Sequence, residues 1–212
     1  MKWMKLAGYF AIISFIIIFI FGLISFFQVS GFNFYKHLFK IIISFFLFLG
    51  FLTLGRFSKN KFLINIAWII LFLSLTTSVF SIIILTNPFI LLYPVINFDI
   101  SISLNTFLLI LLPFGVMSIF NILLGVSLLN VKKVKFVKAT GIFAIIIGIF
   151  YSIFYLILAP IALYSSETSW FHQFFSNSSI FIVEAVIITF FWAIFTFFES
   201  MMFFDASKNF EK

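Results

Sequence analysis

Six long apolar segments, joined by shorter polar or aromatic connections, make up most of this chain. A helix needs about 20 apolar residues to cross the hydrocarbon core of a bilayer, and each segment is close to that length. A membrane β-barrel would instead show alternating segments of about ten residues. We therefore predict an all-α, polytopic membrane bundle that forms one integral membrane domain over residues 1–212. The predicted spans are residues 7–27, 38–55, 62–86, 106–129, 139–163 and 180–204.

The composition excludes a soluble globular domain. Hydrophobic residues make up 64% of the chain and charged residues only 9%, with a mean hydropathy of +1.30. A soluble domain carries about a quarter charged residues, because it has to cover its surface with polar groups. The chain contains no cysteine, which excludes disulfides, thiol catalysis and cysteine-ligated metals.

The basic residues fall almost entirely on one side of the predicted membrane. Cytoplasmic loops are enriched in Lys and Arg, so we predict that both termini are cytoplasmic and that the protein lies in the plasma membrane. The first apolar run is longer than that of a signal peptide, and we expect it to be retained as a span. The net charge of +7 then indicates contact with anionic lipid headgroups rather than with nucleic acid. Only Lys36 and Lys40 belong to the outer side. The inner side holds Lys2, Lys5, Arg56, Lys59, Lys61, Lys132, Lys133, Lys135, Lys138, Lys208 and Lys212.

The basic segments recur at an almost constant interval. Leu49-Gly50 precedes the first basic turn, and Leu124-Gly125 precedes the second one 75 residues later. Ser207-Lys208-Asn209 lies 149 residues after Ser58-Lys59-Asn60. The interval favours a pseudo-repeat of three helical hairpins, formed by spans 1 and 2, 3 and 4, and 5 and 6. Repeats are common in transporters, but evenly spaced spans also place basic turns periodically.

Two outer connections are unusual. Residues 97–105 alternate between polar and apolar side chains, which is a strand signal. Residues 164–179 are rich in aromatic side chains, including Trp170 and Phe171. Aromatic residues at this depth are typical of the membrane interface, and a lid over an outward-facing pocket is the alternative.

Polar side chains within the spans suggest a binding site. Span 3 carries a run of Ser and Thr, and span 4 carries a Ser and an Asn on one face below Pro113. Proline frees a backbone carbonyl inside a span, so neighbours or water have to satisfy it. We predict ligand contacts between spans 3, 4 and 6, and the alternative is hydrogen bonding between helices. The candidate ligand-binding residues are Ser78, Ser118, Asn121 and Glu184.

Two structural ion pairs are suggested by matching separations on spans 2 and 6. Lys40 and Arg56 are sixteen residues apart, and Glu184 and Glu199 are fifteen apart. Both spans run from the outer to the inner side, so adjacent helices could join Lys40 to Glu184 and Arg56 to Glu199. Such pairs would neutralise carboxylates that are costly inside a membrane.

Span 5 carries one face of small residues. Gly141, Ala144, Gly148 and Ser152 recur at helical spacing, which allows another helix to approach closely. We predict that this face packs against a second helix, either within the chain or across a dimer.

No catalytic motif in the sequence has the partner residues that its chemistry needs on the same side of the membrane. Gly125-Val126-Ser127 resembles the nucleophile motif of intramembrane serine proteases, but both histidines belong to the opposite side. No metal set or cofactor fingerprint is evident. We predict a non-enzymatic protein without a cofactor that binds or helps transport a small neutral or apolar solute from the outer side. The alternative is an assembly subunit that packs against a partner through span 5. The number of spans is similar to that of vitamin-binding subunits of energy-coupling-factor transporters, a similarity of helix count that assigns no residue.

Overall fold

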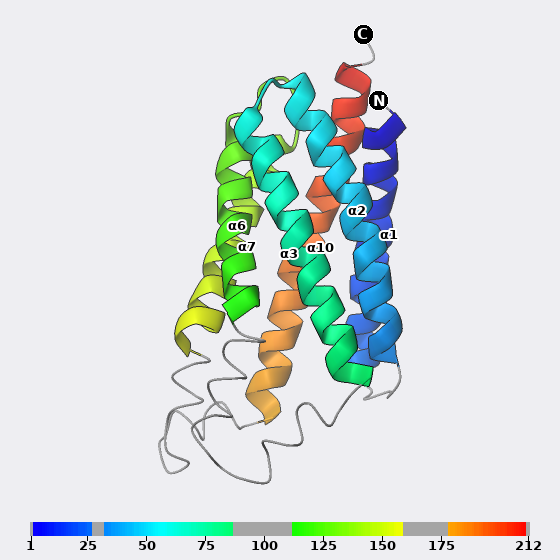
Figure 1. Ribbon diagram of the computed structural model, residues 1–212, viewed down its shortest axis with the longest axis vertical. Helices are drawn as coiled ribbons and strands as arrows, with labels where there is room; N and C mark the ends of the chain where they lie inside the picture. Colours follow the sequence, from blue (N-terminus) through cyan, green and yellow to red (C-terminus); the bar gives the residue numbers. More distant parts are fainter. Residues whose placement is uncertain (1, 27–31, 87–111, 159–177, 211–212) are drawn as a thin grey trace.

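The computed structural model describes residues 2–26, 32–86, 112–158 and 178–210, and this part of the chain is helical apart from two short turns (Figure 1). Its helices are α1 (Lys2–Phe26), α2 (Phe32–Phe57), α3 (Lys61–Thr86), α6 (Leu112–Leu129), α7 (Val137–Ile153), continued by the π-helix η2 (Phe154–Leu158), and α10 (Ser178–Asn209). Each predicted span overlaps one of them, although residues 27, 106–111 and 159–163 of the predicted spans lie outside the described residues. The alternating segment 97–105 and most of the aromatic segment 164–179 lie outside the described residues.

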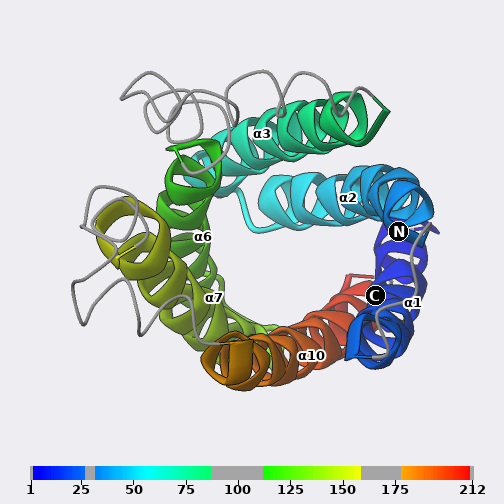
Figure 2. The same cartoon turned by 90° about the horizontal axis from the view of Figure 1, so that it is seen from below.

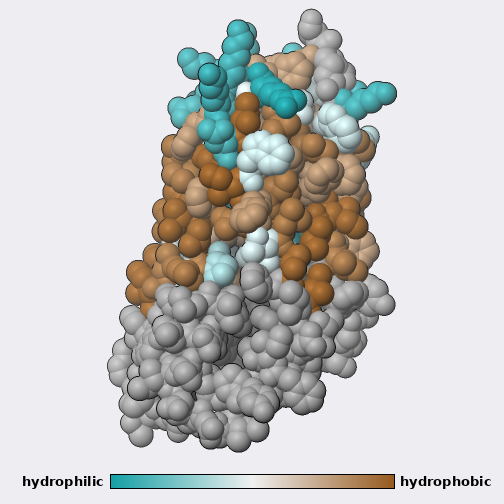
Figure 3. Space-filling view, viewed as in Figure 1, coloured by the Kyte–Doolittle hydropathy of each residue, from teal (hydrophilic) through white to brown (hydrophobic). Residues whose placement is uncertain are grey.

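Four of the helical segments are long and apolar enough to cross a membrane: Leu38–Phe57, Lys61–Val79, Leu112–Leu129 and Val137–Leu158. Large apolar side chains also face outward on these segments, for example Phe72, which is 70% exposed. Figure 3 shows a broad apolar band on the face in view, bounded at one end by hydrophilic side chains. Such a surface suits hydrocarbon and not water, so the chain is a helical membrane protein.

The six described helices form a ring. Each helix packs against its neighbours in chain order, and α10 packs against α1 to close the circle (Figure 2). The two termini therefore lie at the same end of the bundle (Figure 1). We call this the basic end, because exposed basic side chains gather there: Lys2, Lys5, Arg56, Lys59, Lys61, Lys132, Lys133, Lys135, Lys138 and Lys208. The opposite end, where α3 ends and α6 begins, is called the far end.

An apolar core fills the ring near the basic end. Phe203, Met4 and Leu54 are fully buried there, together with Leu63 and Leu128. The rings of Phe51 and Phe203 meet edge to face, with centroids 5.0 Å apart. Because lipid tails are as apolar as these side chains, the core stabilises the fold mainly through close van der Waals packing. This apolar core closes the interior at the basic end.

The small-residue face of α7 lies against α6. A Cβ atom at Gly148 would be 2.7 Å from the Ser118 carbonyl oxygen, and one at Gly141 would be 2.8 Å from the Gly125 carbonyl oxygen. Ala144 is buried between them, and the Ser152 hydroxyl lies 2.8 Å from that of Ser118. The face formed by Gly141, Ala144, Gly148 and Ser152 is therefore filled by a helix of the same chain.

The two turns at the basic end are anchored by asparagines of the recurring Ser-Lys-Asn motif. Asn60 accepts a hydrogen bond from the Leu63 amide, as a cap of α3 does, and its Nδ2 donates to the Ser127 carbonyl at 3.1 Å. Asn209 on α10 donates to the Lys133 carbonyl at 3.0 Å. Asn60 thus holds the end of α6, and Asn209 holds the segment between α6 and α7.

Two hydroxyl pairs also follow the repeat. Ser44 and Ser74 join α2 to α3 through an Oγ–Oγ distance of 2.7 Å. Ser118 and Ser152, which lie 74 and 78 residues further along the chain, join α6 to α7 in the same manner. The recurring unit in the structure is thus a pair of helices around a basic turn. The predicted hairpins have the same interval but group the helices differently, as spans 1 and 2, 3 and 4, and 5 and 6. The third pair in the structure consists of α10 and α1.

Candidate functional site

Buried polar side chains line the ring on the far side of the apolar core. They come from helices all around the ring, and most are hydroxyls. Ser14, Ser74, Thr77, Ser78, Ser118, Thr196, Glu199 and Ser200 are each at most 8% exposed. We call these residues, with Ser44 and Ser152, the polar interior.

The contacts of Gly50 show where these groups lie relative to one another along the axis of the bundle. A Cβ atom there would touch Ala7 and the ring of Phe203, so these residues share one level. Glu199 lies four residues before Phe203 and Ser44 six residues before Gly50, on helices that run in the same direction. At 1.5 Å per residue, Glu199 lies about 6 Å beyond the apolar level and the Ser44–Ser74 pair about 3 Å further. Ser78 lies one helical turn beyond Ser74, about 9 Å from the level of Glu199.

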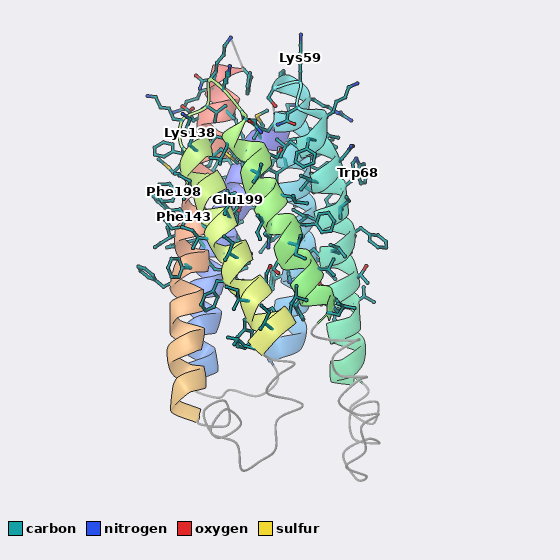
Figure 4. The ribbon with its side chains drawn as sticks, turned by 90° about the vertical axis from the view of Figure 1, so that its left-hand side faces the viewer. Lys59, Trp68, Lys138, Phe143, Phe198 and Glu199 are labelled. Atoms are coloured by element: carbon teal, nitrogen blue, oxygen red, sulfur yellow. The ribbon has the colours of Figure 1, made fainter. Side chains whose placement is uncertain are left out.

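Glu199 is the acidic residue of this interior. It is 1% exposed, and its Oε2 atom has no hydrogen-bond partner. Figure 4 shows Glu199 among the helices, whereas Lys59 and Lys138 lie at the basic end. Phe198 packs against Phe136 and Phe143 of the α7 segment, which brings the buried Thr140 to about the same level as Glu199. An ionised carboxylate without a partner in such surroundings is costly, so this group holds a proton or meets a cation.

Ser78 and Ser118, two of the predicted ligand residues, are both buried. Ser118 donates to the Gly115 carbonyl at 2.6 Å and shares a hydrogen bond with Ser152. The hydroxyl of Ser78, by contrast, has no partner. Asn121 is half-buried on α6. Glu184 lies on α10, in a part of the helix whose side chains are not described.

The predicted ion pair between Arg56 and Glu199 is wrong. Arg56 is exposed at the end of α2, six residues beyond Gly50 toward the basic end. Glu199 lies on the other side of that level, so the two residues are about 15 Å apart in depth. Equal separations along two helices do not fix their register, which is why the prediction failed.

The same register shift separates Lys40 from Glu184 along the helix axes. Lys40 lies ten residues before Gly50, at about the level of Ala193, nine residues from Glu184. Its Nζ lies 5.5 Å from the ring centroid of Phe114. A cation over an aromatic face is stabilised by the ring quadrupole. Lys40 therefore reaches from α2 to α6.

The sequence analysis missed an aromatic cluster near the far end of the described helices. Trp192 Nε1 donates to the Tyr151 hydroxyl at 2.8 Å, and Tyr151 stacks on Tyr155 with ring centroids 5.5 Å apart. Tyr155 in turn stacks on Phe114 at 5.3 Å. Tyr155 lies in η2, and π-helical turns are often found at functional sites. With 38 Phe in the chain, the sequence gives no signal that distinguishes these rings from the lipid-facing ones.

Comparisons with protein-family models, with curated proteins and with solved structures find no match for this chain. The site therefore has to be interpreted from its own geometry. That geometry consists of hydroxyls at several depths, one carboxylate with a free oxygen, an aromatic cluster and an apolar closure. Such groups can bind a small molecule or an ion by hydrogen bonding and charge. The described part of the chain contains no group of three or more His, Asp and Glu side chains that could hold a metal ion.

Proposed function

We propose that this membrane protein binds, and helps to transport, a small neutral or apolar solute in the polar interior. The observation that carries the proposal is that hydroxyls on helices around the whole ring are buried beyond the apolar core, and that the Ser78 hydroxyl has no partner. Buried polar groups in native proteins are normally satisfied, so an unpartnered one favours a missing ligand or water. A non-enzymatic role fits an interior composed mainly of hydroxyl and aromatic groups.

The placement of the apolar core supports entry from the far end. Fully buried side chains such as Phe203 and Leu54 close the ring at the basic end. Beyond them lie Glu199 and the hydroxyls of the polar interior, as far as the Ser118–Ser152 pair of α6 and α7. A solute that enters from the far end would meet the aromatic cluster first and the hydroxyls next.

The assembly role has less support. Its predicted contact surface was the small-residue face of α7, and α6 already fills that face. The outward residues of α7 include Ile142, Ile146 and Ile149, which are large and apolar, as lipid-facing residues are. We therefore give solute binding priority.

Native mass spectrometry of protein extracted gently from its own membrane tests the proposal. We expect a reproducible small mass bound in a one-to-one ratio, and we expect Ser78→Leu to lose it because leucine fills the space at the free hydroxyl. Val79→Leu is the matched control, because Val79 is 48% exposed on the same helix. If Ser78→Leu does not purify as a folded protein, Ser78→Val replaces it. A mass retained in the folded Ser78 variant, or absent from the wild type, contradicts the proposal.

We further propose that the basic end faces the cytoplasm of the plasma membrane, where its lysines contact anionic headgroups. The chain has no cysteine, so single cysteines can be introduced without background labelling. In intact cells, an impermeant thiol reagent should label Glu167→Cys and leave Lys59→Cys unlabelled until the membrane is opened. The reverse pattern would invert the orientation.

A further inference from the structure

We infer that Glu199 binds a small monovalent cation, which accompanies the solute into the polar interior. The inference rests on the proposed function in one respect, since it uses the same interior. The key observation is geometric: a carboxylate that is 1% exposed and lies on the boundary between the apolar core and the hydroxyls keeps one oxygen without a partner.

No described basic side chain supplies the counter-charge. On α1, Lys2 and Lys5 are exposed at the basic end, and Lys138 of α7 is exposed there too. Arg56 lies about 15 Å away in depth, and Lys40 lies about 9 Å away on the far side, next to Phe114. Glu199 is therefore buried without a protein cation at its own level in the described part of the chain.

Oxygen atoms that could complete a cation site lie at nearby levels. Thr196, one turn from Glu199 on α10, donates its hydroxyl proton to the carbonyls of Trp192 and Ala193. Thr140 donates in the same way to the Phe136 carbonyl. Because both hydroxyls donate their proton to backbone carbonyls, their oxygen lone pairs remain available to accept or to bind a cation. The Ser44–Ser74 pair lies about 3 Å further toward the far end.

The single carboxylate indicates a singly charged ligand. Divalent cations in proteins usually require several carboxylate or carbonyl oxygens, and the described interior supplies one carboxylate. One positive charge would neutralise Glu199, while neutral hydroxyls replace part of the hydration shell. An alkali metal ion and a protonated amine share this chemistry, and the experiment separates them.

The test measures thermal unfolding of the full-length protein in detergent at constant ionic strength and pH. Sodium, potassium and methylammonium chloride are each compared with N-methylglucamine chloride, whose cation is too bulky for the site. We expect one of the small cations to raise the Tm of the wild type, because a ligand that binds only the folded state stabilises it. A response to sodium or potassium identifies a metal ion, and a response to methylammonium alone identifies an amine.

Variants of two acidic residues on α10 assign the effect. Glu199→Gln should lose the cation response, and Glu199→Asp should keep it at higher cation concentration. Asp205→Asn is the matched control, because Asp205 binds the Lys135 amide and Asn209 outside the interior and should respond like the wild type. In N-methylglucamine, Glu199→Gln should be at least as stable as the wild type, since glutamine has nearly the same shape and cannot carry a charge that is costly to bury.

Three outcomes overturn the inference: no cation response in the wild type, the same response in Glu199→Gln, or a Glu199→Gln protein that is less stable in N-methylglucamine. The last result would give Glu199 a structural role. Failure of this inference is distinguishable from failure of the proposed function. A bound solute mass with no cation effect contradicts only the cation site, and a cation effect without any solute mass contradicts only the solute proposal.

Discussion

Gly125→Ala should separate α6 from α7, although the substitution adds a single methyl group. A Cβ atom at this position would lie 2.4 Å from the Gly141 carbonyl oxygen, 2.6 Å from Ile145 Cγ1 and 3.0 Å from the Ile145 amide nitrogen. Carbon–oxygen contacts between packed helices are normally about 3.3–3.6 Å, so the backbones have to move apart by about 1 Å. Overpacking of this kind costs about 1–3 kcal/mol.

Gly8→Ala is the matched control. A Cβ atom at Gly8 would lie 3.1 Å from the ring of Phe204, and a side-chain ring can shift where a backbone carbonyl cannot. Both substitutions gain about 1 kcal/mol of helix propensity, which cancels when the two are compared. Gly125→Ala should therefore be less stable than Gly8→Ala by about 1–3 kcal/mol. Circular dichroism during SDS titration measures this difference. Equal midpoints for the two variants would refute the idea that backbone proximity holds α6 against α7.

Three further predictions follow from hydrogen bonds in the described residues. Asn60→Ala should destabilise the protein more than Asn60→Asp, by about 1 kcal/mol. The reason is that aspartate keeps the α3 cap and loses only the donor to Ser127. SDS titration measures the stability of both variants. Asp205→Ala should speed hydrogen exchange at the Lys135 amide, and an unchanged rate in mass-spectrometric exchange would contradict the 2.6 Å contact. Ser118→Ala should lower the free energy of unfolding by about 1 kcal/mol, whereas Ser78→Ala should leave it unchanged or raise it. The reason is that the Ser118 hydroxyl has partners and the Ser78 hydroxyl has none. Equal SDS-titration midpoints for the two variants would show that the hydrogen bonds of Ser118 make no net contribution.

The helices were predictable because each apolar run is long enough to bury its backbone in a helix. Without water, a spanning segment has to satisfy its amide and carbonyl groups internally, so apolar length alone specifies the element. The small-residue spacing of α7 was also informative, since glycine at positions 141 and 148 permits contact that a larger residue prevents. The identity of the facing helix could not be predicted, because several spans carry small residues.

The candidate site was harder to predict because it depends on how the helices slide past one another. Ser78 and Ser118 stood out as polar residues within apolar spans, and both are buried. Glu199 was assigned to an ion pair because its distance from Glu184 matched that between Lys40 and Arg56. Contacts such as that of Gly50 with Phe203 fix the register, and they leave Glu199 level with Phe46 instead of Arg56. Such contacts depend on side-chain shape, which a one-dimensional spacing does not contain.

The repeat gives a reason to regard Glu199 as a specialised residue. Gly50 lies eight residues before Ser58, and Glu199 lies eight residues before Ser207 at the matching position of the third helix pair. The second pair has Gly125 there, 75 residues after Gly50. In the first two pairs a Cβ atom would come within 2.4 Å of a neighbouring helix, so packing requires glycine. In the third, the larger side chain of Glu199 is accommodated and is only 1% exposed, so packing does not require glycine there. Packing alone would be satisfied there by a leucine, which costs nothing to bury in a membrane. The carboxylate is therefore best explained by something that it binds.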